Sequence, residues 1–213
     1  LALTDAGAST TRYRLSADAT INASDLLLGG SRAVGALAVG ATATGAATVT
    51  IPASADAVIY SPVGGDAFDY ANGAGEFLHA GANGATGGNR TLRSTLRFDL
   101  TGQIPAGSIV TQAVVRLTNY KHTGTLRLHR ITQAWTEGAA NANSGEGLGV
   151  AATPGDVTWV SASHGASVWG AAGGSFSASP SATVTLTDIG RFGITGPGLI
   201  ADVESMLSSP AGN

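Results

Sequence analysis

The chain has no cysteine among its 213 residues, and only 12% of its residues are charged. Without cysteine, no disulfide can staple the fold and no thiolate can bind a metal or attack a substrate. Long apolar runs are also lacking, because the longest, residues 33–47, is interrupted by three glycines and is shorter than a membrane span. A surface so poor in charge is typical of extracellular β proteins. We therefore expect an extracellular or cell-surface chain with no membrane insertion.

Hydrophobic residues make up 43% of the chain and glycine contributes 31 residues. Alternation of apolar and polar side chains over residues 91–100 predicts a half-buried strand. Further strands are expected at 13–16, 26–28, 46–51, 57–60, 109–120, 125–132, 156–160 and 182–186, and only 198–207 has helical spacing. Many short strands with turn signals favour an all-β fold. We expect a β-sandwich or jelly roll over 54–213, a partial Ig-like β unit over 1–53, and almost no helix.

Residues 54–213 resemble a DNRLRE domain, a β-sandwich family grouped with carbohydrate-binding module family 96. The resemblance is carried by SADA at 54–57, RSTLRFDL at 93–100, IPAGSIVTQAVVRL at 104–117, TLRLHRITQAWTEG at 125–138, DVTW at 156–159 and GPGLIADVESMLSSPAGN at 196–213. It implies a non-catalytic module that binds an acidic polysaccharide such as alginate.

Residues 10–52 are similar to the C-terminal part of a CARDB module, an Ig-like domain associated with cell adhesion. The similarity is carried by YRLSADATINASDLLLGGSRAV at 13–34 and GAATVTIP at 45–52. Both resembled units are incomplete, because the first lacks strands and the second lacks its last strands. Since the chain opens on Leu1 with no leader, we expect a mature or excised form.

Three arrangements complete such sheets. The N-terminal strands fold back on their own chain, or they insert into the next subunit of a filament by donor-strand exchange, or the missing strands belong to a longer parent protein. The sequence leaves all three open.

Basic residues are concentrated between Arg90 and Arg130, where seven of them accompany a single acid, Asp99. If the strands there form a meander, one solvent-facing surface carries Arg93, Arg97, Arg116, Tyr120, Arg127 and His129. Guanidinium groups bind carboxylates with two hydrogen bonds, which suits polymers of uronic acids. The alternative is a solvated face whose arginines pair with acids of the same chain. Nucleic acid is not expected as a partner, because the pI is ≈ 5.7 and no nucleic-acid motif is present.

Aromatic side chains allow two interpretations. Trp169 lies in a glycine-rich loop and is a candidate platform for a sugar ring, although burial in the core is the alternative. Trp135 and Trp159 are expected in the core, at positions that the family resemblance marks as structural.

Asp18, Asn22 and Asp25 offer oxygen ligands for a structural Ca²⁺ ion, but their spacing departs from an EF-hand loop and favours a plain turn over a metal site. No other cofactor is expected. No paired acids, oriented Ser-His-acid set or metal-ligand spacing is visible, so we expect no enzyme. Two function classes remain, a carbohydrate-binding or adhesion module and a structural subunit of an extracellular filament.

Overall fold

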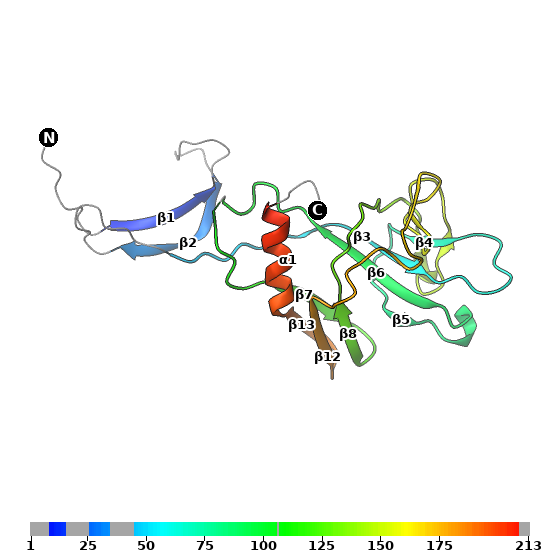
Figure 1. Ribbon diagram of the computed structural model, residues 1–213. Coiled ribbons are helices and arrows are strands. Elements are labelled where there is room, and N and C mark those ends of the chain that lie inside the picture. The colour runs from blue at the N-terminus through cyan, green and yellow to red at the C-terminus, as the bar shows by residue number, and fades with distance from the viewer. Residues whose placement is uncertain (1–8, 16–25, 35–44, 106, 209–213) are drawn as a thin grey trace, which may run out of the picture. The chain divides into compact units, whose positions relative to one another are not determined.

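The computed structural model describes residues 9–15, 26–34, 45–105 and 107–208 (Figure 1). The chain divides into two compact units, residues 1–52 with 100–108, and residues 53–99 with 109–213. The described elements are antiparallel strands, two short 3₁₀ turns and one α-helix. The predicted all-β class is therefore confirmed, whereas the sandwich or jelly-roll arrangement stays a prediction.

The first unit contains a two-stranded hairpin of β1 (Ser9–Leu15) and β2 (Leu26–Val34). Its register places Ser9 opposite Val34 and Leu15 opposite Leu26. Among the described residues neither strand pairs with a third. The strand expected at 46–51 is absent: these residues are irregular, and only Val49 and Ile51 among them are partly buried.

The second unit is built around a five-stranded antiparallel sheet. Its order is β5 (Gly81–Ala82), β6 (Thr91–Phe98), β3 (Ala53–Tyr60), β4 (Tyr70–Asn72) and β9 (Val150–Ala151). The central strand β3 buries both faces: Ala57 and Ile59 lie on one, and Val58 and Tyr60 on the other. Because both faces are covered there, residues 57–60 of β3 form a continuous apolar run rather than an alternating pattern.

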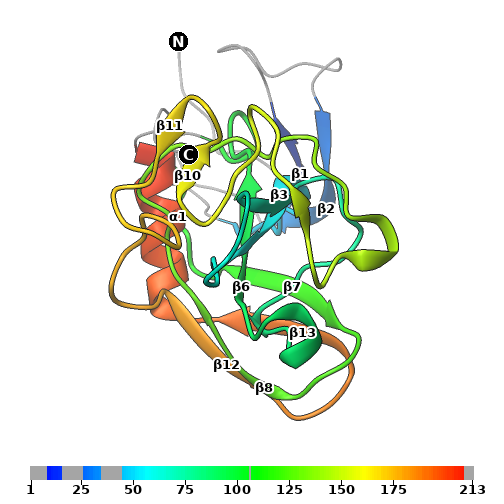
Figure 2. The same ribbon diagram turned by 90° about the vertical axis from the view of Figure 1, so that its right-hand side faces the viewer.

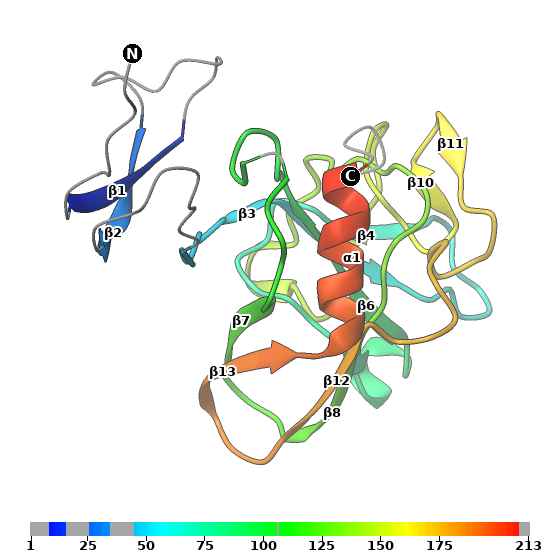
Figure 3. The same cartoon turned by 60° about the vertical axis from the view of Figure 1, so that its left-hand side comes forward.

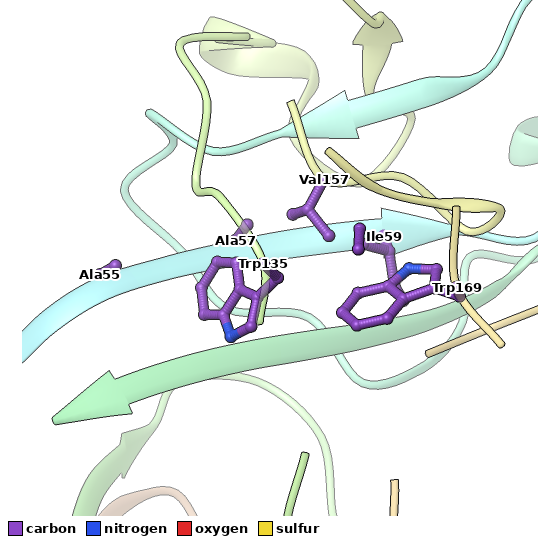
Figure 4. Close-up of a cluster of buried hydrophobic side chains, with 7 residues drawn as sticks. Ala55, Ala57, Ile59, Trp135, Val157 and Trp169 are labelled. Atoms are coloured by element: carbon purple, nitrogen blue, oxygen red, sulfur yellow. The ribbon is translucent and has the colours of Figure 1, made fainter. Parts of the chain in front are cut away.

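One face of β3 is covered by tryptophans from two loops. The buried cluster consists of Ala55, Ala57, Ile59, Trp135, Val157, Ala162 and Trp169, with Ile131 and Trp159 packed against it. Figure 4 shows the Trp135 and Trp169 indoles next to β3. Loop residues supply most of the apolar area because β3 itself presents small alanines on this face.

Two further ladders pair β7 (Val114–Asn119) with β13 (Gly190–Thr195), and β8 (Gly124–Leu128) with β12 (Ala182–Leu186). They lie beside helix α1 (Pro197–Ser208), as Figures 1 and 3 show. The loops carry η1 (Ala85–Gly87), η2 (Asn143–Gly145), β10 (Ser161–Ser163) and β11 (Ser167–Val168), the last two visible in Figure 2.

Residues 91–100, 109–120 and 125–132 do not form the meander that a shared ligand face would require, because their strands belong to three different sheets. The strand β6 already has neighbours on both edges, β3 and β5. The strand β7 instead aligns its Leu117 with Phe192 of β13, and both side chains pack, partly buried, against a small apolar cluster. The strand expected at 156–160 is also absent. These residues form a loop that is buried because Asp156 organises it.

Candidate functional site

The four predicted ligand-binding arginines lie on three separate ladders. Arg93 and Arg97 belong to the five-stranded sheet, Arg116 to the β7–β13 ladder and Arg127 to the β8–β12 ladder. The structure therefore does not bring the predicted set together on one meander. Each group has to be judged by its own surroundings.

Arg93 and Arg97 face the tryptophan cluster instead of solvent. Arg97 lies opposite Ala55, and its guanidinium carbon is 4.8 Å from the centre of the Trp135 ring. The guanidinium carbon of Arg93 is 4.7 Å from the centre of the Trp159 ring, and the guanidinium donates a hydrogen bond of 2.6 Å to the Gly173 carbonyl. Both arginines are partly buried. The prediction that they face solvent is wrong, because a flat guanidinium stacks on an indole while its alkyl stem covers apolar surface.

Replacing Arg97 with alanine is expected to lower the free energy of unfolding by about 1–2 kcal/mol, through lost stacking and packing. The Arg97 Nε has no hydrogen-bond partner among the described residues, so removing it leaves no acceptor unpaired. Arg97→Met keeps the apolar stem and serves as the control. Urea denaturation of both variants checks the result, and wild-type stability together with loss of glycan binding would contradict it.

The side chains of Trp169 and His129 are also engaged within the fold, where each contacts a backbone carbonyl. Trp169 is 5% exposed, and its Nε1–H donates to the Thr158 carbonyl at 2.9 Å. The predicted sugar platform at Trp169 is therefore replaced by a core role. The His129 ring is partly buried, with Nδ1 2.8 Å from the Ser177 carbonyl. Trp135 is 8% exposed, which confirms its predicted place in the core.

The outer face of the β7–β13 ladder carries the remaining candidates. We call this surface the arginine face: it consists of Arg116, Thr118, Tyr120, Arg191 and Thr195, all exposed. Arg116 lies opposite Gly193, and Arg191 opposite Thr118, so the two arginines are diagonal neighbours. Such neighbours are roughly 7–8 Å apart, within reach of one ligand.

The two arginines of the arginine face have no ion-pair partner among the described residues. Within the described residues, Arg116 and Arg191 take part in no ion pair, because the ones present join Arg90 to Asp66 and His164 to Asp69. Gly193, which has no side chain, leaves the Arg116 guanidinium uncovered. Two exposed guanidinium groups on neighbouring strands present planar forks that fit carboxylates.

Tyr120 adds an aromatic surface at the end of β7. It is 70% exposed and contacts Phe77, which is 47% exposed, with ring centroids 5.6 Å apart and rings nearly perpendicular. Asn119 fixes the neighbouring backbone by donating hydrogen bonds to the carbonyls of His122 and Asp188. Exposed aromatic rings held in place by their neighbours are suited to stack on the C–H face of a sugar.

Sequence reasoning missed Arg191 and Phe77. Arg191 lies in β13, whose Gly190 and Gly193 weaken the strand signal, so its partnership with Arg116 emerges only from the pairing. Phe77 belongs to an irregular segment far from Tyr120 in sequence. Arg127 is exposed on the outer face of the β8–β12 ladder, opposite Thr183, and stands apart from the arginine face.

The buried acids anchor loops. Glu146 is 8% exposed and accepts hydrogen bonds of 2.8 Å from the amides of Glu76 and Phe77, which positions the Phe77 ring. Burial, and then the nearby charges of Glu137 and Glu146, raise the pKa of Asp56. The amide of Asp56 itself donates to Glu137. These contacts tie the loops to the sheet.

The predicted calcium ligands Asp18, Asn22 and Asp25 lie outside the described residues. In the described part of the chain, no group of three or more Asp, Glu or His side chains is placed to hold a metal ion. Within that same part, no helix has the length and apolar character needed to span a bilayer.

Two exposed guanidinium groups on the β7–β13 ladder, Arg116 and Arg191, thus lie on a surface that ends at an exposed aromatic pair, Tyr120 and Phe77. Comparison of the chain with protein-family models, curated proteins and solved structures finds no match. The similarity to DNRLRE and CARDB modules thus stays a prediction.

Proposed function

We propose that this protein is a non-catalytic extracellular module that binds an acidic polysaccharide through the arginine face. The observation that carries the proposal is the diagonal pair Arg116 and Arg191, exposed and without ion-pair partners in the described residues. Each guanidinium takes one uronate carboxylate with two hydrogen bonds. Tyr120 and Phe77 stack against a sugar ring further along the polymer.

The binding mode follows from the chemistry of the face. A neutral glucan presents the same C–H faces to Tyr120 but has no carboxylates. It therefore cannot form the charge-assisted hydrogen bonds with the two arginines. The electrostatic part of the affinity is screened by salt, over about 8 Å at physiological ionic strength. Binding to polyuronate is therefore expected to weaken as salt rises, whereas ring stacking is less sensitive.

Replacing Arg116 and Arg191 together with alanine is expected to weaken binding to a polyuronate by about 100-fold. Each lost charge-assisted hydrogen-bonding group contributes roughly 1.5 kcal/mol, or about tenfold. Affinity electrophoresis through gels containing alginate or a neutral glucan measures the effect. The wild type is expected to be retarded by alginate only.

Two controls separate the fork geometry from net charge. Arg127→Ala removes one exposed charge from the neighbouring ladder and is expected to change retention little. The double substitution Arg116→Lys and Arg191→Lys keeps the charge but loses the planar fork, and intermediate retention is expected. Equal retardation by both gels at low salt, or equal losses for Arg127→Ala and Arg116→Ala, would refute the proposal.

A further inference from the structure

The apolar cluster between the β7–β13 ladder, the β8–β12 ladder and α1 is incompletely covered. Only Ala182, Ile194 and Leu199 are buried, whereas six members remain partly exposed: Ala113, Val115, Leu117, Leu128, Val184 and Phe192. The tryptophan cluster shows the opposite balance, with seven buried members and two partly buried ones. Half-covered apolar faces mark sites of interaction.

The two ladders around this cluster are also narrow. Each consists of two strands, and in the described part of the chain neither β7 nor β8 has a partner on its second edge. The unpaired edges of β7 and β8 and the half-covered apolar cluster therefore belong to the same two ladders. Natural β proteins cover such edges with another segment.

The β1–β2 hairpin also lacks a further strand partner among the described residues. Its strands pair only with each other among the described residues, and an isolated two-stranded hairpin is marginally stable in water. The two strands carry four leucines, three arginines and no acid. Helix α1, beside the half-covered cluster, carries Asp202 and Glu204 and no basic residue. The apolar content and the opposite charges match the hairpin to this face.

We propose that the β1–β2 hairpin of one copy packs on the half-covered cluster of a second copy, between β7 and α1. The contact joins two different surfaces of the chain, so it is heterologous and propagates head to tail into a filament unless the rotation closes a ring. The proposal is independent of polysaccharide binding, because it uses the inner face of the β7–β13 ladder and the arginine face is the outer one.

Disulfide trapping between separately purified single-cysteine variants tests the contact. The native chain has no cysteine, so every disulfide reports the introduced pair. One protein carries Thr10→Cys or Thr11→Cys, adjacent positions that sample both faces of β1. The other carries Leu117→Cys on the inner face of β7 or, as the matched control, Arg116→Cys on the outer face. Because the cysteines reside on different molecules, a covalent heterodimer cannot arise within one chain.

After mixing and mild oxidation, Leu117→Cys is expected to give at least fivefold more heterodimer than Arg116→Cys with one of the hairpin variants. Equal yields from the two β7 positions would overturn the proposal. So would a disulfide that forms only when both cysteines are in one chain, since the hairpin then covers its own cluster.

Light scattering of the full chain gives a second, independent readout. The mass is expected to rise above 21.0 kDa with concentration. Reversing the helix charges with Asp202→Lys and Glu204→Lys is expected to weaken association about tenfold without touching the apolar cluster. A 21.0 kDa species at every concentration, or unchanged association of the charge-reversed variant, contradicts the proposal.

Discussion

Replacing Trp135 with alanine is expected to lower the free energy of unfolding by about 3–5 kcal/mol, as truncation of a large buried aromatic side chain does. Trp135 is 8% exposed, lies in the cluster beside Ala55 and Ala57, and supports the Arg97 guanidinium. Its removal leaves a cavity and deprives Arg97 of its stacking partner. Urea denaturation followed by the remaining tryptophan fluorescence measures the loss.

Trp135→Phe is the matched control, because it keeps an aromatic face under Arg97 and is expected to cost less than half as much. The opposite pattern would show that the ring is a sugar platform: an unchanged melting temperature with loss of polysaccharide retention. Because Trp135 belongs to the buried cluster drawn in Figure 4, a loss of stability is the expected effect.

Replacing Asp156 with alanine is expected to lower the free energy of unfolding by about 3–5 kcal/mol, because one buried donor and three partly buried ones lose their acceptor at once. The carboxylate is fully buried and accepts hydrogen bonds from the Ala139 and Ala140 amides and from the amide and hydroxyl of Thr153. Gly138 has φ +82° and passes so close to Asp156 that a Cβ there would collide with the carboxylate. One acid thus holds both ends of the 139–155 loop.

The same carboxylate makes stability depend on pH. Burial raises the pKa of Asp156, but the hydrogen bonds from Thr153, Ala140 and Ala139 outweigh it and leave the pKa below its usual value. A pKa depressed by folding gives a stabilisation that is fully present above the unfolded-state pKa, about 3.9, and is lost as the pH falls through the folded-state value.

Asp156→Asn has no charge to titrate, so the gap in stability between it and the wild type is expected to narrow progressively as the pH falls below about 4. Urea denaturation of both proteins between pH 7 and pH 3 measures the gap. A constant gap across that range would show that Asp156 does not titrate with unfolding.

The fold class was predictable from the sequence because it depends on local chemistry. Period-two alternation in residues 91–98 and the helical spacing in 198–207 are local signals, and both elements form. The strand at 182–186 was predicted with the bounds that the structure shows. Loop composition predicted 139–155 correctly as a long connection, although it contains η2 and the whole of the two-residue strand β9.

The candidate site was predictable only in part. Arg116 and Tyr120 are exposed as expected, but their companions Arg191 and Phe77 come from segments distant in sequence. Alternation along β6 correctly placed Arg93 and Arg97 on one side of the strand. It carried no information on whether another layer covers that side.

By itself, the sequence determined that this protein is all-β, free of disulfides, poor in charge and basic in its middle, because composition and local periodicity decide these properties. Only the tertiary structure decided which arginines are available to a ligand. Strand pairing joined β7 to β13, and long-range packing placed Trp135 and Trp159 over the β6 arginines. The physical reason is that a guanidinium stacks as readily on an indole of its own chain as it binds a carboxylate of another molecule. The choice depends on which partner the fold brings near.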